Sequence, residues 1–160
     1  MTTQSMRATT AAESRYRIHQ PNSRGRRVLV LALDAQGQDI LGELLAEPWN
    51  QSLFGYLQDD RLQRISATGE AVAEATPLAD SLDSIDAIVL VVTPDSPAAA
   101  FDLIGDLSQT RRIMTAGFVF GDTRERALHA LLPTVRRITV SMVTHADRDA
   151  LTESLHALRA

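Results

Sequence analysis

The chain contains neither cysteine nor lysine, and each absence removes a class of chemistry. Without cysteine it forms no disulfide, has no thiolate nucleophile and offers no sulfur ligand to zinc. Without lysine it has no amine for a Schiff base and no lysine to place against the phosphates of a nucleotide. All 16 basic residues are arginine. The function therefore uses neither thiol nor amine chemistry.

Long apolar runs are missing as well. The longest, Val28–Leu33 and Ala87–Val92, have the length of a strand and fall short of the roughly 18 residues of a membrane span. The start of the chain lacks the apolar core of a secretory signal, although its Ser/Thr/Arg-rich composition also resembles a transit peptide. We expect no membrane span and a cytoplasmic location. The length of 160 residues and the hydrophobic content of 44% predict one domain with a sizeable core.

Charge is distributed unevenly, although the formal net charge is only −4. We interpret residues 1–25 as a basic arm and residues 26–160 as a single α/β domain with an acidic balance. Nucleic acid is not an expected partner, because Tyr16 is the only aromatic residue in the arm. A protein partner, a homo-oligomer or a disordered tail fits the arm better. The arginines that would make such contacts are Arg7, Arg15, Arg17, Arg24, Arg26 and Arg27.

Apolar runs alternate with amphipathic segments along most of the chain. The expected strands are Arg27–Leu33, Ala87–Val92, Met114–Phe120 and Ile138–Val143. Each is followed by apolar residues at helical spacing, such as Phe101 and Ile104. Strands that alternate with helices of about a dozen residues indicate βαβ units. The predicted fold class is α/β, a Rossmann-like three-layer sandwich with a mostly parallel central sheet.

The region between the first two of these strands is ambiguous. Leu53–Leu57 and Arg61–Thr68 predict either a hairpin around Gln58-Asp59-Asp60 or a broken helix. Glu70–Ser84 is rich in alanine, glutamate and leucine, so we expect it to be partly helical, with Pro77 as an interruption.

Small polar residues after the strands predict where the helices begin, because their side chains accept hydrogen bonds from the first free N–H groups of a helix. Asp122 with Glu125 resembles a capping box, and Thr144 with Asp147 repeats the pattern. The expected cap residues are Asp34, Ser96 (with Pro97 at the first helical position), Asp122 with Glu125, and Thr144 with Asp147.

The turns after the first strand and after Ala87–Val92 form the candidate site, because ligands of doubly wound sheets bind outside the carboxyl ends of the strands. A phosphate loop needs glycines that let backbone N–H groups approach the anion. The first turn offers only Gly37, and Asp34 and Asp39 would repel a phosphate. We therefore expect no cofactor. The residues that would line a ligand crevice are Asp34, Gln36, Gly37, Gln38, Thr93, Asp95 and Ser96.

Catalytic and metal-binding residues are not expected. Asp95 and Ser96 offer an acid and a nucleophile, but no motif ties a histidine to them, and a helix cap explains the serine. His145 and His156 lie about three helical turns apart, too far along one helix to share a metal ion.

Three stretches carry a resemblance to a known family. VLVLALDAQGQDILGELL keeps Gly37 of a glycine-rich first turn, VVTPDSPAA stands where a GGGTGTG phosphate loop would be, and TAGFVFGDTRERALHAL echoes the next strand and helix. Over residues 27–143 this order resembles the nucleotide-binding half of the FtsZ/tubulin family. The resemblance implies a nucleotide-binding type of fold whose phosphate-loop glycines, and with them GTP binding and hydrolysis, are lost.

A phospho-receiver domain is similar to this chain in length. A receiver needs paired acids after its first strand, a phosphorylatable aspartate at the end of its third and a later lysine. Here Asp34 stands alone after the first strand, Asp95 lies beyond the end of its strand, and no lysine exists. A working receiver is therefore not expected.

Taken together, these features predict a non-catalytic accessory or regulatory protein that acts through protein–protein contacts or self-association on a degenerate nucleotide-binding-type fold. Two alternatives stay open. One is a small-molecule or nucleotide-binding domain that uses the crevice at the carboxyl ends of the strands. The other is an enzyme whose catalytic residues come from distant positions.

Overall fold

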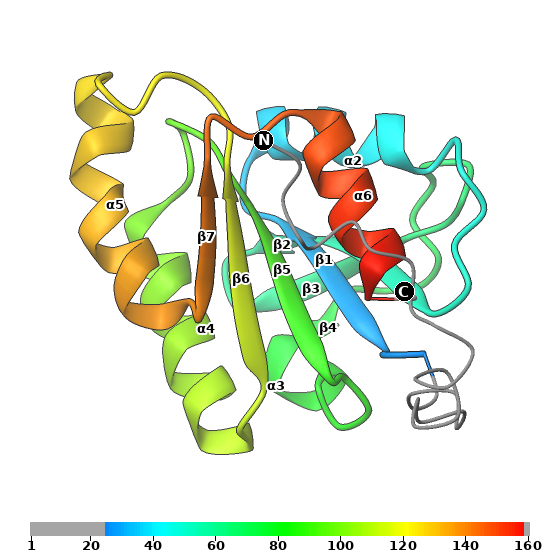
Figure 1. The fold of residues 1–160 in the computed structure, drawn as a ribbon. Coiled ribbons are helices and arrows are strands. Elements are labelled where there is room, and N and C mark those ends of the chain that lie inside the picture. The colour runs from blue at the N-terminus through cyan, green and yellow to red at the C-terminus, as the bar shows by residue number, and fades with distance from the viewer. Residues whose placement is uncertain (1–24, 159–160) are drawn as a thin grey trace, which may run out of the picture.

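The computed structural model describes residues 25–158, and these contain one seven-stranded sheet with the order β4-β3-β2-β1-β5-β6-β7 (Figure 1). Five neighbouring strands of the sheet are mutually parallel, in the order β2, β1, β5, β6 and β7. β3 and β4 add antiparallel strands at the β2 edge. The strand bounds are β1 Val28–Ala32, β2 Ser52–Gln58, β3 Arg61–Ile65, β4 Thr76–Pro77, β5 Ala87–Val92, β6 Met114–Val119 and β7 Ser141–Thr144.

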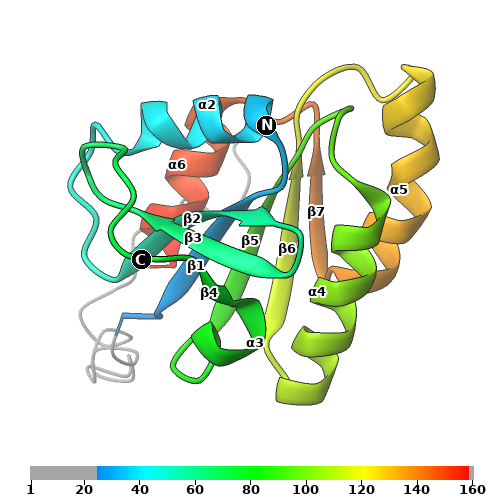
Figure 2. The same cartoon turned by 180° about the vertical axis from the view of Figure 1, so that it is seen from behind.

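Helices cover both faces of the sheet, which confirms the predicted three-layer α/β sandwich. Figures 1 and 2 show α2 and α6 on one face and α3, α4 and α5 on the other. The helix bounds are α2 Ala35–Leu44, α3 Leu78–Ser81, α4 Ala98–Arg111, α5 Arg126–Ile138 and α6 Arg148–Ala157. None of these helices combines the length and the apolar character that a bilayer span requires.

The two central strands explain why the sheet is doubly covered. Every residue of β1 and β5 is buried, and alternate side chains enter opposite layers. Leu29 and Leu31 join the core beneath α3, α4 and α5, whereas Val28 and Val30 join the core beneath α2 and α6. The continuous apolar runs of the sequence are thus strands packed on both faces.

The region from Leu53 to Thr68, for which the sequence left two possibilities, folds as a hairpin and not as a broken helix. β2 and β3 pair in antiparallel register, with Gln58 opposite Arg61. The turn is tight, and Asp59 adopts a positive φ of 56°. Aspartate tolerates this left-handed conformation better than most residues, so the Asp59-Asp60 pair suits a two-residue hairpin loop. Within β2 the close pairing with β3 requires glycine at position 55, because a Cβ there would lie 2.7 Å from the Gln63 carbonyl oxygen.

One expectation is confirmed and one predicted element needs correction. Glu70–Ser84 is partly helical, as expected, with the single turn of α3 directly after Pro77, and the residues before the helix run extended along β3 as the short β4. The strand predicted at Ile138–Val143 begins only at Ser141, because α5 continues through Ile138. Local β-branched composition favoured a strand there, but Ile138 packs against Gly105 of α4, and this helix–helix contact decides the boundary.

Of the four predicted caps, Asp34 holds as predicted, and at α6 the cap is Asp147 and not the predicted box of Thr144 with Asp147. Asp34 and Asp147 accept hydrogen bonds from the backbone N–H groups of Gly37 and Ala150, each at 2.8 Å. Ser96 is not a cap, because α4 begins at Ala98 with Pro97 in the cap position. The box predicted at Asp122 and Glu125 is also absent: Glu125 is itself the cap residue, and the Asp122 side chain accepts from the Arg124 N–H. Asp147 caps α6 without help from Thr144.

Candidate functional site

The chain changes direction across the sheet between β1 and β5. From β1 it runs through α2 to β2 on one side, then returns to β5 on the other side of β1. Such a switch point is where ligands of open α/β sheets bind. The loops that follow β1 and β5 meet there, and they are the two turns that the sequence indicated as the candidate site.

Asp34 lies at the centre of this switch point. Its Oδ1 accepts the hydrogen bond from the Gly37 N–H, which caps α2. Its Oδ2 accepts two hydrogen bonds from the opposite loop, one from the Thr93 hydroxyl and one from the Ser96 hydroxyl, each at 2.7 Å. The carboxylate therefore binds its own helix and the loop after β5 at the same time. We call Asp34, Gly37, Thr93 and Ser96 the Asp34 cluster.

The loop after β5 is also closed on itself. The Thr93 N–H donates to Ser96 Oγ at 3.0 Å, and the Ser96 N–H donates to the Thr93 carbonyl oxygen at 3.2 Å. The Asp95 N–H donates to Thr93 Oγ1 at 3.3 Å. Thr93 and Ser96 are 0% and 5% exposed. Their hydroxyls are thus used inside the protein, and they stabilise one loop conformation against Asp34.

Gly37 has a packing role in this arrangement. A Cβ at this position would lie 3.1 Å from the Cβ of Ala32, so the glycine lets the first turn of α2 approach the end of β1 closely. In a phosphate loop the free N–H groups of such a turn would point at an anion. Here the Gly37 N–H points at a carboxylate of the protein itself. The Asp34 carboxylate therefore occupies the N–H group that would bind the phosphate in a phosphate-binding turn.

The other predicted site residues lie outside the Asp34 cluster. Gln36, Gln38 and Asp95 are exposed. The crevice predicted between Asp34–Gln38 and the loop after β5 is bridged at its centre by the hydrogen bonds of Asp34. Within residues 25–158, no group of three or more histidine, aspartate or glutamate side chains is placed to hold a metal ion.

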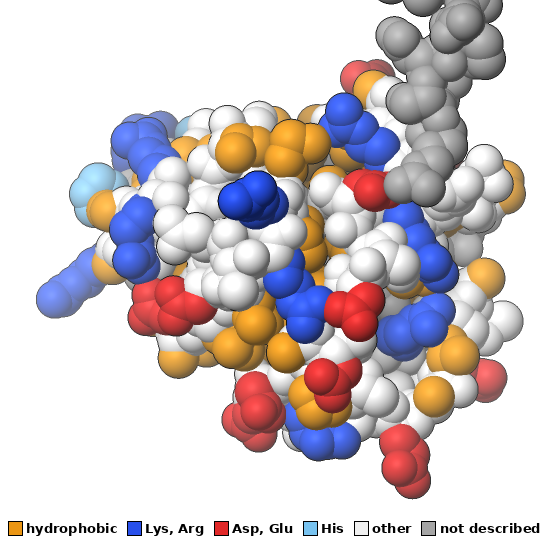
Figure 3. All heavy atoms as spheres, turned by 90° about the horizontal axis from the view of Figure 1, so that it is seen from below, with side chains coloured by type: hydrophobic (Ala, Val, Ile, Leu, Met, Phe, Trp, Pro, Cys, Tyr) orange, Lys and Arg blue, Asp and Glu red, His pale blue; other side chains and the backbone are white. Residues whose placement is uncertain are grey.

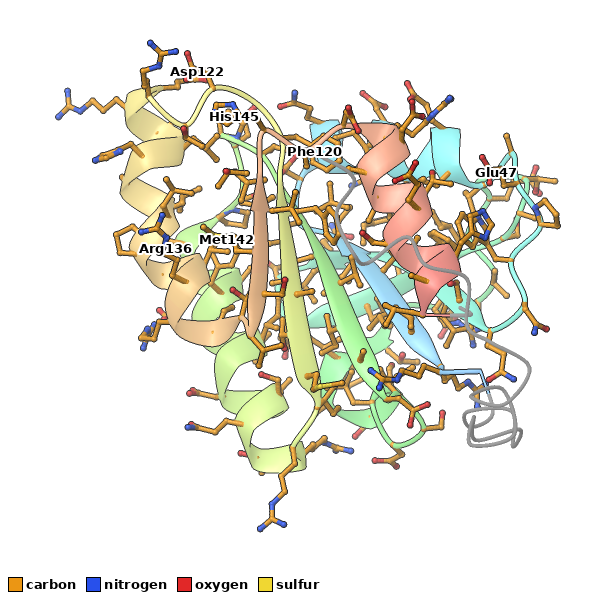
Figure 4. All side chains as sticks on the ribbon, viewed as in Figure 1. Glu47, Phe120, Asp122, Arg136, Met142 and His145 are labelled. Atoms are coloured by element: carbon orange, nitrogen blue, oxygen red, sulfur yellow. The ribbon has the colours of Figure 1, made fainter. Side chains whose placement is uncertain are left out.

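A second polar group at the same end of the sheet was missed by the sequence reasoning. Asp122 and Thr123 follow β6, and His145 follows β7; Figure 4 shows Asp122 and His145 in the loops above these strands. Thr123 Oγ1 lies 3.3 Å from His145 Nε2, and His145 adopts a φ of +53°. The sequence pattern indicates Asp122 only as a helix cap and His145 only as a candidate metal ligand; the remaining signal is position, since His145 directly follows β7 and the other two lie in the loop after β6.

A backbone hydrogen bond lowers the pKa of Asp122. The hydrogen bond from the Arg124 backbone N–H is the main cause that lowers the pKa of the Asp122 carboxyl below its ordinary value. The charges of Arg124 and His145 act in the same direction. Because Asp122 and its partners are open to solvent, this group is a surface feature and does not form an enclosed site.

The face at the amino ends of the parallel strands carries mixed charge. Figure 3 shows arginine and acidic side chains interspersed with hydrophobic ones on this face, with no continuous field of one sign. Arg111 forms an ion pair with Asp83 there, and Arg137 forms one with Asp102 at 2.8 Å. Proteins that bind nucleic acid through the phosphate backbone usually present a single-sign basic surface, and this face does not.

Only part of the predicted basic arm lies in the described residues. Arg26 and Arg27 are exposed at the entrance to β1, and the Arg27 N–H donates to Asp86 Oδ2 at 2.8 Å. Arg7, Arg15, Arg17 and Arg24 lie outside the described residues.

No protein-family model matches the sequence, and no curated protein is similar to it. Among solved structures, the chain is similar to a Burkholderia pseudomallei protein described as related to pilus assembly, with 15% identity and a TM-score of 0.48 over 86% of this chain and 92% of that one. An AraC family transcriptional regulator from Pseudomonas putida gives 17% identity and 0.43 over 83% and 90%.

The Legionella pneumophila response regulator LqsR gives 14% identity and a TM-score of 0.42 over 84% of this chain, which spans 44% of that protein. Similarity at this level carries no information about activity. None of these three proteins is described as a member of the FtsZ/tubulin family, and the resemblance to that family stays a prediction.

Proposed function

We propose that this protein is a non-catalytic accessory or regulatory protein that acts through protein–protein contacts or self-association, in the cytoplasm, on a degenerate nucleotide-binding-type fold. The observation that carries the proposal is the Asp34 cluster. The position where an α/β protein of this topology binds its ligand is spanned by a carboxylate that accepts hydrogen bonds from both facing loops.

The chemistry of the cluster argues against phosphate ligands. A phosphate brought to this turn would meet the Asp34 carboxylate, and it would have to displace Asp34 Oδ1 to accept the hydrogen bond of the Gly37 N–H. The displaced carboxylate would also lose the hydrogen bonds that its Oδ2 accepts from the Thr93 and Ser96 hydroxyls. A nucleotide would also lose the lysine that usually contacts its phosphates, since the chain has none.

The cluster also argues against Ser96 as a nucleophile. The hydroxyl of an activated serine donates to a base and stays open to substrate. Ser96 Oγ donates to Asp34, accepts from the Thr93 N–H and is 5% exposed as a residue. These contacts support a structural role for the serine.

A ligand screen of the full-length protein tests the proposal. Thermal unfolding is followed with ATP, GTP, NAD and FAD, each with and without Mg²⁺, at concentrations up to the millimolar range. A ligand that binds only the folded state raises the melting temperature. Because we expect no binding, we expect no saturable rise in melting temperature with any of these compounds. A saturable shift of several degrees that disappears in Asp34→Arg would favour the ligand-binding alternative.

The enzyme alternative has its own test. A broad screen for hydrolase and transferase activity is run on the wild type and on Asp95→Ala and Ser96→Ala. We expect no turnover in any of the three proteins. Turnover by the wild type that is lost in Ser96→Ala would contradict the proposal and identify the loop after β5 as catalytic.

A further inference from the structure

β7 (Ser141–Thr144) lies at one edge of the sheet, and apart from its short length of four residues it lacks the features that usually protect an edge strand. Natural edge strands avoid pairing with other chains through charged residues, proline, bulges or a covering element. The segment Ile138–Thr144, ITVSMVT, whose last four residues form β7, has no charge, no proline and no glycine, and five of its seven residues are β-branched. Within residues 25–158, β6 is the only strand that pairs with β7.

The opposite edge of the same sheet is protected. β4 is only two residues long, ends in Pro77 and is held by its partner β3. Arg61 of β3 also donates to the Ala75 carbonyl oxygen beside it. The β4 edge is therefore better protected against pairing than the β7 edge, which is longer and has no proline.

The backbone of β7 shows which groups face outward. The N–H groups of Val140 and Ala146, which flank the strand, donate to Thr115 and Val119 of the β6 side at 2.8 and 2.9 Å. Because successive residues of a strand direct their N–H groups to opposite sides, those of Ser141 and Val143 point to the free edge. β7 therefore presents two outward donors and two outward acceptors.

We propose that β7 is a self-association edge, on which a second copy of this chain pairs its own β7 in antiparallel register about a two-fold axis at Met142. In this register Ser141 lies opposite Val143 of the second copy, so the outward groups of both strands are satisfied. Val140 then lies opposite Thr144 of the second copy. The inference rests on the proposed function and names its partner and its surface.

Charge around the strand favours a second copy in this orientation. Arg136 and Arg137 precede the segment, and Asp147 and Asp149 follow it, with Arg148 between them. Arg137 already pairs with Asp102 and Asp149 with Arg148, so Arg136 and Asp147 are the charges without an ion pair in residues 25–158. Antiparallel pairing brings the basic end of one copy toward the more acidic end of the other, whereas parallel pairing would bring like ends together. Figure 4 shows Arg136 on α5 and Met142 on β7 at this side of the molecule.

Side-chain exposure agrees with an uncovered edge. Val140 is 75% exposed, the largest exposed fraction among the large hydrophobic residues described, and Met142 and Val143 are half-buried. An isologous contact of this kind places each of these residues at the interface twice. Antiparallel pairing of two identical strands also closes the assembly at a dimer, because each copy uses its single open edge.

A charge-pair experiment tests this register on the full-length protein. Val140 and Thr144 are both exposed in the single chain, so lysine or glutamate at either position leaves the fold intact. Val140→Lys with Thr144→Lys places like charges opposite one another at both ends of the paired strands. Val140→Lys with Thr144→Glu places opposite charges there and is the matched control. Far-UV circular dichroism and melting temperature check that both variants fold.

Sedimentation velocity from low micromolar to near-millimolar concentration gives the dimer dissociation constant. We expect the wild type to dimerise, the Lys/Lys variant to dissociate more readily, and the Lys/Glu variant to dimerise about tenfold or more tightly than Lys/Lys. A wild type that stays monomeric over the whole range would overturn the inference. So would a dimer that holds Lys/Lys and Lys/Glu with equal strength, because its interface would lie elsewhere.

A backbone experiment tests the same edge independently. Ser141→Pro removes an outward N–H and should abolish dimerisation, whereas Ser141→Ala keeps that N–H and should leave it unchanged. Dimerisation by the folded Ser141→Pro variant at the wild-type constant would overturn the pairing. The outcome is separable from the proposed function: a monomer that binds no nucleotide refutes only the edge, and a β7 dimer that binds nucleotide refutes only the proposed function.

Discussion

Replacing Asp34 by alanine should destabilise the protein far more than the loss of an ordinary helix cap. The change removes three hydrogen bonds at once, from the Gly37 N–H and from the Thr93 and Ser96 hydroxyls. Loss of the cap alone costs about 1 kcal/mol. Each hydroxyl bond to a charged acceptor contributes about 1.5 kcal/mol at the lower end of its range, which is appropriate for a half-buried carboxylate. The expected total is about 3–4 kcal/mol.

Asp147→Ala is the matched control. Asp147 caps α6 in the same way, with one hydrogen bond of 2.8 Å from the Ala150 N–H, and no other hydrogen bond to its side chain is found in the described residues. Its loss should cost about 1 kcal/mol. Both variants should still fold, since a domain of this size has a stability of about 5–15 kcal/mol.

Urea unfolding followed by far-UV circular dichroism gives both free energies of unfolding. The reasoning predicts that Asp34→Ala loses at least about 2 kcal/mol more than Asp147→Ala, with an unchanged dependence on urea concentration. Equal losses would show that the bonds to Thr93 and Ser96 add nothing. A gain in stability on removing Asp34 would refute the structural role outright, because residues held for function at a cost in stability behave in that way.

Two further predictions concern helix packing and one surface carboxylate. Gly105→Ala should destabilise the protein by about 1–3 kcal/mol, because the new Cβ would lie 2.7 Å from Ile138 Cγ2. Gly42→Ala in α2 should instead stabilise the protein by about 0.5–1 kcal/mol, because its Cβ meets nothing within 4 Å. Thermal unfolding of the two variants checks that their effects have opposite signs. The Asp122 carboxyl should titrate below the ordinary pKa of aspartate in an NMR titration, and Arg124→Ala, which keeps the backbone N–H, should retain most of that lowering. Because the folded pKa is lowered, the stabilisation is present at neutral pH and is lost as the pH falls through the folded pKa; an Asp122 that titrates at or above the ordinary value would contradict the assignment of the backbone bond.

The sequence was sufficient for the α/β fold class and for the two central strands of the sheet. Val28–Ala32 and Ala87–Val92 are continuous apolar runs of strand length, and such runs have few other stable placements in a domain of this size. Asp34 was also predictable as a cap, because capping depends on residues three positions apart. In each case the decisive interaction is local or is repeated along the element.

The hydrogen bonds of the Asp34 cluster and the end of α5 were not predictable in the same way. Ser96 has the local pattern of a cap before Pro97, yet its hydroxyl bonds Asp34, 62 positions away in the sequence. Ile138 has the composition of a strand, yet contact with Gly105 keeps it in α5. Both outcomes depend on which element lies opposite, and single-sequence patterns do not contain that information.

The most direct test of the central claim is an amide NMR titration of the full-length protein with Mg²⁺-ATP, Mg²⁺-GTP and NAD. The backbone N–H groups of Gly37, Thr93 and Ser96 all lie in the Asp34 cluster, so their resonances report any ligand at the switch point. If the cluster closes this position, the three resonances keep their places up to millimolar ligand. Saturable shifts confined to these three and their neighbours would contradict the account and show that the crevice binds a ligand.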